Sequence, residues 1–182
     1  MMTPSTMPNR IHFEFKPNKA LEAILYISSK LYSGDAGFHK ISKIFYFADK
    51  MHLQRYGRLI CGDHYVAMEH GPVPSNTYDI MKKVVAYNST LKDLDFESFS
   101  NDGKKVVPSR EANMGLLSES DIECLNESIE FCGEKDFDTL TIISHDKAWE
   151  SADVNDSISL ESIIATLQDP EILLEHLIEN GA

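Results

Sequence analysis

Residues 38–57, FHKISKIFYFADKMHLQRYG, decide the fold class of the chain. Apolar side chains recur in this stretch at intervals of three and four residues, which is the spacing of one face of an α-helix. We therefore predict an amphipathic helix. Its outer side is expected to be basic, with Lys40, Lys43, Lys50 and Arg55. The helix should end near Gly57, because glycine readily adopts the left-handed conformation of a C-cap.

Helical signals also occur on both sides of this stretch. The apolar spacing of residues 20–31 predicts a first helix that ends at Ser33-Gly34, and Ser75 is predicted to be the N-cap of a third helix. Capping and proline signals predict further helices toward the C-terminus. These helices are expected to open at Ser118, Phe137, Ser159 and Pro170.

The middle of the chain contains short extended segments. Residues 64–69 are rich in strand-forming side chains, and Gly71-Pro72-Val73-Pro74 cannot form a regular helix. Residues 96–100 and 104–107 flank Asn101-Asp102-Gly103, which predicts a β-hairpin. We therefore expect a mainly α fold, a compact helical domain with a small inserted β-hairpin or short sheet.

Composition places the chain among globular proteins with one core. Its 182 residues are 42% hydrophobic and 25% charged. No apolar run is long enough to cross a bilayer, and the first residues lack the apolar segment of a secretory signal, so we expect a cytoplasmic protein. The three cysteines, Cys61, Cys124 and Cys132, are interpreted as reduced and partly buried thiols.

Charge is distributed unevenly along the chain. Residues 111–182 hold two Lys or Arg against eighteen Asp or Glu, whereas residues 1–60 hold nine against four. The first two helices are compatible with a helix-turn-helix, but Phe38, Ile41 and Phe45 are needed for the core, and DNA binding requires a clustered basic face. We therefore do not expect DNA binding. The acidic third either attracts a basic protein partner or simply keeps the chain soluble.

Side-chain patterns give little support for catalysis. The segment Cys61-Gly62-Asp63-His64 with Glu69-His70 lacks the ligand number and spacing of a zinc site, and we favour a half-buried thiol beside turn histidines. Adjacent residues such as Ser144-His145-Asp146 cannot relay a proton as a triad does. We expect no catalytic residues, no metal and no cofactor. The enzyme alternative is a metal-dependent hydrolase around Cys61, His64 and His70.

The Gly-Pro segment that follows His70 is interpreted as a stiff corner. It would hold Tyr65, His70 and Tyr78 in fixed relation, which suits either a binding edge or a structural pivot, and we favour the structural role. Tyr46, Phe47 and Trp149 are expected to be core aromatics, because an aromatic stripe at helical spacing is usually buried.

Three motifs resemble the Panacea, or SocA-like, antitoxin family. They are KIFYFADKMHL at residues 43–53 followed by Gly57, AMEHGPVPS at residues 67–75 followed by Tyr78, and SHDKAW at residues 144–149. The polar residues 1–17 are expected to form an N-terminal leader, and the resemblance implies a single Panacea domain at residues 18–180. It also implies motif residues that could bind a partner: Tyr46, Tyr65, Glu69, His70, Gly71, Pro72, Tyr78 and Trp149.

The resemblance further implies an antitoxin of a type II toxin–antitoxin system that neutralises its cognate toxin by direct protein–protein binding. We expect a basic, RNA-targeting toxin that meets the acidic C-terminal face. One alternative is a proteolytic adaptor that delivers a toxin to a ClpXP-type AAA+ protease, and another is a phage or prophage accessory interaction protein. No membrane partner is expected.

Overall fold

The computed structural model describes residues 11–32 and 34–182, and the fold is mainly α, as predicted. The helices are α1 Pro17–Lys30, α2 Phe38–Tyr56, α3 Ser75–Lys82, α4 Glu119–Gly133, α5 Phe137–Ser144, α6 Lys147–Glu150, α7 Leu160–Ile164 and α8 Pro170–Glu179. The strands are β1 Tyr65–Met68, β2 Gly71–Pro74, β3 Phe99–Ser100, β4 Val107–Pro108 and β5 Ser157–Ile158. Four short 3-10 turns lie at Ser89–Leu91, Phe96–Ser98, Asp102–Lys104 and Met114–Leu116.

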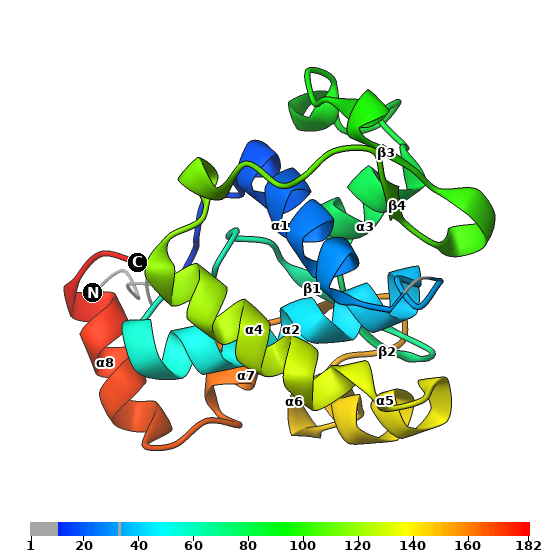
Figure 1. Cartoon of the computed structure of the whole chain (residues 1–182). Coiled ribbons are helices and arrows are strands. Elements are labelled where there is room, and N and C mark those ends of the chain that lie inside the picture. The colour runs from blue at the N-terminus through cyan, green and yellow to red at the C-terminus, as the bar shows by residue number, and fades with distance from the viewer. Residues whose placement is uncertain (1–10, 33) are drawn as a thin grey trace, which may run out of the picture.

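The predicted amphipathic helix is α2, and it lies at the centre of the molecule (Figure 1). It packs against α1, α3, α4, α5, α7 and β2, and Ile41, Ile44 and Phe45 are buried in the main core. Gly57 ends the helix in the left-handed conformation, as predicted. The helix is enclosed on many sides and serves the core, as expected.

Helix α4 lies along α2 and opens as the sequence predicts (Figure 1). Ser118 accepts a hydrogen bond from the Asp121 amide, and the Asp121 carboxylate accepts one from the Ser118 amide, which completes a capping box. The inner side of the helix buries Cys124 and Cys132, and Cys61 is buried in the same core. All three thiols are free and are more deeply buried than expected.

The two extended segments expected at residues 64–74 are strands β1 and β2, and with β5 they form a three-stranded sheet in the order β2-β1-β5. Strands β1 and β2 are antiparallel, with Tyr65 opposite Pro74 and Met68 opposite Gly71. Because β2 is an edge strand, its prolines break no hydrogen bonds to a further strand. Strand β5 pairs with the other side of β1, with Tyr65 opposite Ile158, and the sequence analysis did not predict it.

The predicted β-hairpin is present as β3 and β4, which pair through Phe99 and Pro108. Its strands are only two residues long, because the chain between them folds into the 3-10 turn at Asp102–Lys104. The hairpin lies beside α3 at one end of the molecule (Figure 1).

Several predicted helix ends were wrong. Helix α1 ends at Lys30, four residues before the predicted Gly34, and the extended Leu31 is its C-cap; Ser33 lies outside the described residues. Ser75 is the first residue of α3 and not its N-cap. Ser159 caps α7 as predicted, but that helix ends at Ile164, whereas the apolar spacing predicts that it continues to Leu167.

Residues 11–16, within the expected leader, are extended and pack against the helical body. Ile11 is buried, and the Lys16 amide donates to the Cys61 carbonyl at 2.9 Å. In the described part of the chain, no helix is long and apolar enough to cross a membrane.

Candidate functional site

A buried lysine holds the corner that the sequence analysis singled out. Lys43 was expected on the outer, basic side of α2, but its side chain is fully buried beneath β2, and its Nζ donates to the Pro72 carbonyl at 2.9 Å. Burial lowers the pKa of Lys43 to about 7. Lys43 is buried because of a tertiary contact, since the acceptor for its amine lies 29 residues away in the sequence.

Gly71 makes this close packing possible. Its φ is +107°, a region that side chains with a Cβ rarely adopt. A Cβ at this position would lie 2.4 Å from Ser144 Oγ and 2.9 Å from Lys43 Nζ. The glycine therefore lets the turn between β1 and β2 rest directly on α2 and the end of α5.

The carboxylate of Asp146 ties α2 to α6. Its Oδ2 accepts hydrogen bonds from the Tyr46 hydroxyl at 2.7 Å and from Lys50 Nζ at 2.9 Å. Its Oδ1 accepts from the Trp149 amide at 3.1 Å and so caps α6. Burial, followed by the hydrogen bond to Asp146, raises the pKa of Tyr46. Tyr46 is a core aromatic, as expected.

Tyr65 and Asp49 form a second buried pair. The Tyr65 hydroxyl donates to Asp49 Oδ2 at 2.6 Å, and the Ile60 amide donates to Oδ1 at 2.8 Å. Burial raises the pKa of Asp49 to about 7, although both hydrogen bonds favour the charged form. Tyr65 is thus a structural residue that fixes β1 on α2.

One surface gathers motif residues at the point where the corner meets solvent. We call it the turn face, and it consists of His39, Glu69, His70, Phe137, His145 and Trp149. The Phe137 ring stacks on His39 with centroids 4.0 Å apart and contacts His70 edge-on at 5.0 Å. The His145 ring stacks on Trp149 at 3.7 Å, and its Nε2 lies 3.1 Å from the Glu69 carbonyl oxygen.

The turn face is both exposed and anchored. The side chains of Glu69 and His70 are 84% and 53% exposed, and Phe137 is 47% exposed. Trp149 is half-buried and donates its Nε1 hydrogen to the Met68 carbonyl at 2.8 Å. Burial, followed by the charge of Lys43, lowers the pKa of His39 to about 4, so this imidazole is neutral in the folded protein at neutral pH.

The structure separates the predicted motif residues into two groups. Glu69, His70 and Trp149 belong to the turn face, whereas Tyr46, Tyr65, Gly71 and Pro72 are buried and build the corner beneath it. Tyr78 belongs to neither group. It lies against Phe38, with ring centroids 5.9 Å apart.

Sequence reasoning missed three members of the turn face, His39, Phe137 and His145. His39 and Phe137 lie in no motif, and His145 lies in the SHDKAW motif but was not among the candidate binding residues. An exposed aromatic side chain has the same sequence signature as a buried one. The contact between Phe137 and His70 is visible only in three dimensions.

The segment considered for metal binding is divided between the core and the surface. Cys61 is buried in the main core, and His64 is exposed. Asp63 is buried and accepts hydrogen bonds from the amides of Asn76 and Thr77 at the start of α3. In the described part of the chain, no three His, Cys, Asp or Glu side chains are grouped so that they could hold a metal ion.

Ser144, His145 and Asp146 each have a different partner. Ser144 Oγ donates to the Thr141 carbonyl at 3.1 Å, His145 Nε2 faces the Glu69 carbonyl, and Asp146 caps α6. No hydrogen bond among the described residues links the three side chains in series.

The acidic C-terminal third is partly neutralised by the protein itself. On α4, Glu123 and Glu127 form ion pairs with Arg55 at 2.9 and 2.7 Å. Asp138 and Glu150, which adjoin Phe137 and Trp149 in the sequence, are exposed. Exposed carboxylates therefore adjoin the turn face in the sequence, as does the exposed Lys147 of α6.

Comparison with known proteins identifies the family. The profile of the family described as "Antitoxin SocA-like, Panacea domain" matches residues 41–150, which is more than half of the chain. No curated protein and no solved structure matches the chain. The matched region contains the corner and all of the turn face except His39. The chain therefore belongs to the SocA-like, Panacea-domain antitoxin family.

Proposed function

We propose that the chain is the antitoxin of a type II toxin–antitoxin pair and that it neutralises its cognate toxin by binding it directly through the turn face. In this proposal the chain performs no chemistry of its own. The observation that carries the proposal is that residues matched by an antitoxin family converge on one exposed aromatic surface.

The composition of the turn face suits a protein partner. Tryptophan and other aromatic side chains are enriched among residues that dominate binding energy, because they bury a large area with few rotatable bonds. Trp149, Phe137 and the imidazoles stacked on them present such an area.

The corner beneath the face also favours binding. The hydrogen bonds of Lys43 and Trp149 fix the turn from two sides, so little conformational entropy is lost when a partner docks. We expect a basic toxin, such as an RNA-targeting enzyme. The exposed carboxylates of Glu69, Asp138 and Glu150 would attract it and speed the encounter.

The test is co-expression in a bacterial host with the protein encoded beside the gene for this chain. We expect the wild-type chain to restore growth. The variants Phe137→Lys and His70→Lys should lower rescue by at least about tenfold, because each places a positive charge where the basic partner packs. The control Ile172→Lys changes a side chain on α8 that is 68% exposed, and it should rescue normally.

The outcomes separate the proposal from its alternatives. Thermal unfolding of the purified variants checks that each one folds. Rescue by both turn-face variants at the wild-type level would remove the turn face as the binding surface. If the wild-type chain fails to rescue growth, the antitoxin role is wrong. A fall in toxin abundance together with capture of an AAA+ unfoldase would indicate that the chain delivers the toxin to a protease and does not mask it.

A further inference from the structure

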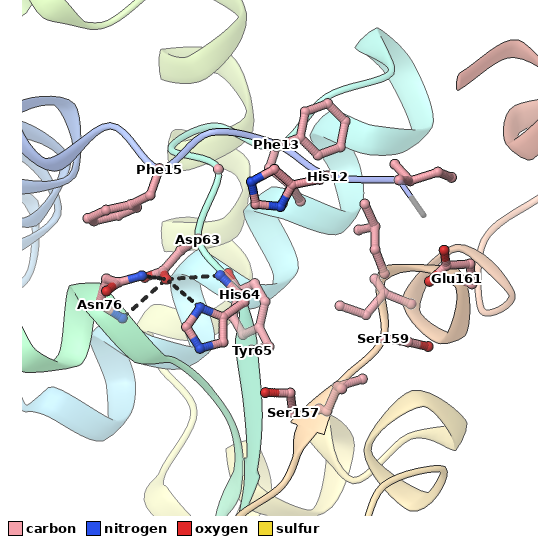
Figure 2. Close-up of a pocket in the computed structure, with 16 residues that line it drawn as sticks. His12, Phe13, Phe15, Asp63, His64, Tyr65, Asn76, Ser157, Ser159 and Glu161 are labelled. Carbon is pink, nitrogen blue, oxygen red and sulfur yellow. Dashed lines mark hydrogen bonds and ion pairs between the residues drawn. The ribbon is translucent and has the colours of Figure 1, made fainter. Parts of the chain in front are cut away.

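A pocket lies at the end of β1 opposite the turn face. Its volume is about 480 Å³. Four parts of the described chain line it: the extended segment at residues 11–15, residues 59–65 leading into β1, Asn76 at the start of α3, and the β5–α7 corner. Figure 2 shows Phe13 and His12 on one side, Asp63 and Asn76 on another, and Glu161 across the opening from them. The function proposed above does not use this pocket.

The walls of the pocket are fixed by close backbone packing. Gly62 has a φ of +75°, and a Cβ on it would lie 2.1 Å from the Glu14 carbonyl oxygen. Only glycine therefore allows residues 11–15 to run so close to the start of β1. The pocket is part of the folded structure and needs no rearrangement to form.

Aromatic and aliphatic side chains supply most of the inner surface. Phe13 and Phe15 come from the extended segment, Tyr65 from β1, and Ile158 and Ile163 from the β5–α7 corner. Such walls bury the methylene groups of a long side chain and offer ring faces to a cation.

Among the described residues that line the pocket, the fixed charges have one sign. They are the carboxylates of Asp63 and Glu161, and this described lining contains no Lys or Arg. Asp63 already accepts five hydrogen bonds, from the amides of His64, Asn76 and Thr77 and from the side chains of Asn76 and Thr77. Glu161 is half-buried, and no described residue gives its carboxylate a hydrogen bond or an ion pair. A partly desolvated anion beside apolar walls favours a cationic group with an apolar stem.

We propose that this pocket receives an arginine or lysine side chain of the partner protein, with the stem against Phe13 and Phe15 and the cationic head at Glu161. The proposal rests on the proposed function in taking the toxin as that partner. Residues 11–15 and 157–163 lie outside the family match at residues 41–150. Part of the pocket wall therefore lies outside the matched domain, and a wall of this kind can select one partner.

The direct test uses a small probe and does not require the toxin. The isotope-labelled chain is titrated with N-acetyl-arginine amide and, separately, with N-acetyl-citrulline amide, which has nearly the same shape and no charge. NMR shifts of the backbone amides at residues 62–65 and 157–161 report binding. We expect a Kd on the order of 1 mM for the arginine probe, the level that a ligand of this size reaches. The citrulline probe should bind about 3-fold more weakly, as expected for a partly exposed ion pair.

Charge variants make the test specific. Glu161→Gln should abolish the preference for arginine over citrulline, because it removes the anion and retains the shape. Glu171→Gln is the matched control, since Glu171, like Glu161, is a glutamate in the first turn of a helix, here α8, but it is exposed and does not line the pocket. This variant should keep the full preference.

Three results would overturn the proposal. They are the absence of shifts at the pocket amides, equal binding of the two probes, and an unchanged preference in Glu161→Gln. A dimer in sedimentation that Glu161→Gln dissociates would assign the pocket to a second copy of the chain and would also overturn it. Rescue of growth by the wild-type chain tests the antitoxin function separately. If the pocket prefers arginine but the chain does not rescue growth, the partner is not the toxin, and the pocket remains a site for a basic side chain.

Discussion

Replacing Gly71 with alanine tests the corner on which the turn face depends. The new Cβ would lie 2.4 Å from Ser144 Oγ and 2.9 Å from both Cε and Nζ of Lys43, at a φ of +107°. Backbone strain at such a φ costs about 1–2 kcal/mol. Moving the buried Lys43 amine off the Pro72 carbonyl costs about 1–3 kcal/mol more. We expect Gly71→Ala to lower the free energy of unfolding by about 4 kcal/mol.

The matched control is Gly103→Ala. Gly103 also has a positive φ, +58°, but no atom lies within 4 Å of its Cβ position. It should therefore lose only about 1 kcal/mol, the conformational cost alone. The variant Ser144→Ala removes the nearest contact, so the cost of Gly71→Ala should fall by about 1–2 kcal/mol in that background.

Urea unfolding followed by fluorescence measures these differences. Trp149 is the only tryptophan of the chain, and its ring is hydrogen-bonded to the Met68 carbonyl, three residues before Gly71. Its emission therefore reports on the corner itself, and far-UV circular dichroism reports on the helices. A cost for Gly71→Ala no larger than that for Gly103→Ala, or no relief by Ser144→Ala, would refute the packing argument.

Three further substitutions test the buried polar groups. Asp63→Ala should cost about 3 kcal/mol in urea unfolding, because the Thr77 amide at the start of α3 loses its acceptor; a loss below about 1 kcal/mol would contradict this role. Lys43→Met should remove a pH dependence of the free energy of unfolding. The pKa of Lys43 is about 7 in the folded protein and 10.5 in the unfolded chain, so the unfolded chain binds more protons between these two pH values. Wild-type stability therefore rises with pH in this range, by up to about 1.4 kcal/mol per pH unit. Equal slopes of stability against pH in the wild type and in Lys43→Met would argue against a lowered pKa of Lys43 in the folded protein. Asp146→Ala should cost about 2 kcal/mol and shift Trp149 emission to the red, because α6 loses its cap; an unchanged spectrum would count against that cap.

The sequence predicted elements whose signals are local. The apolar spacing of residues 38–57 located α2, Gly57 ended it, and the Ser118 capping box opened α4. Strand β5 was missed because two residues carry no periodicity, and it exists only through pairing with β1. The end of α1 was misplaced because Leu31 leaves the helix without a glycine or proline to mark the change.

Lys43 shows why part of the site was beyond local reasoning. A lysine between apolar positions ordinarily indicates the solvent side of a helix. Here the acceptor for its amine comes from β2, and Gly71 provides the space, so burial depends on residues distant in sequence. The extended segment at residues 11–15 did carry a local signal, since Ile11, Phe13 and Phe15 alternate with polar residues.

The turn face and the pocket lie at the two ends of the same strand. From His64 to Glu69 the chain is extended over five residues, which corresponds to about 16 Å at the usual rise of a strand. A standard protein interface covers about 800 Å² on each partner and is wider than this distance. In the two proposals one toxin contacts both. The turn face lies almost wholly within the family match, whereas residues 11–15 and 157–163 of the pocket lie outside it, so we propose that the first gives binding and the second gives partner choice.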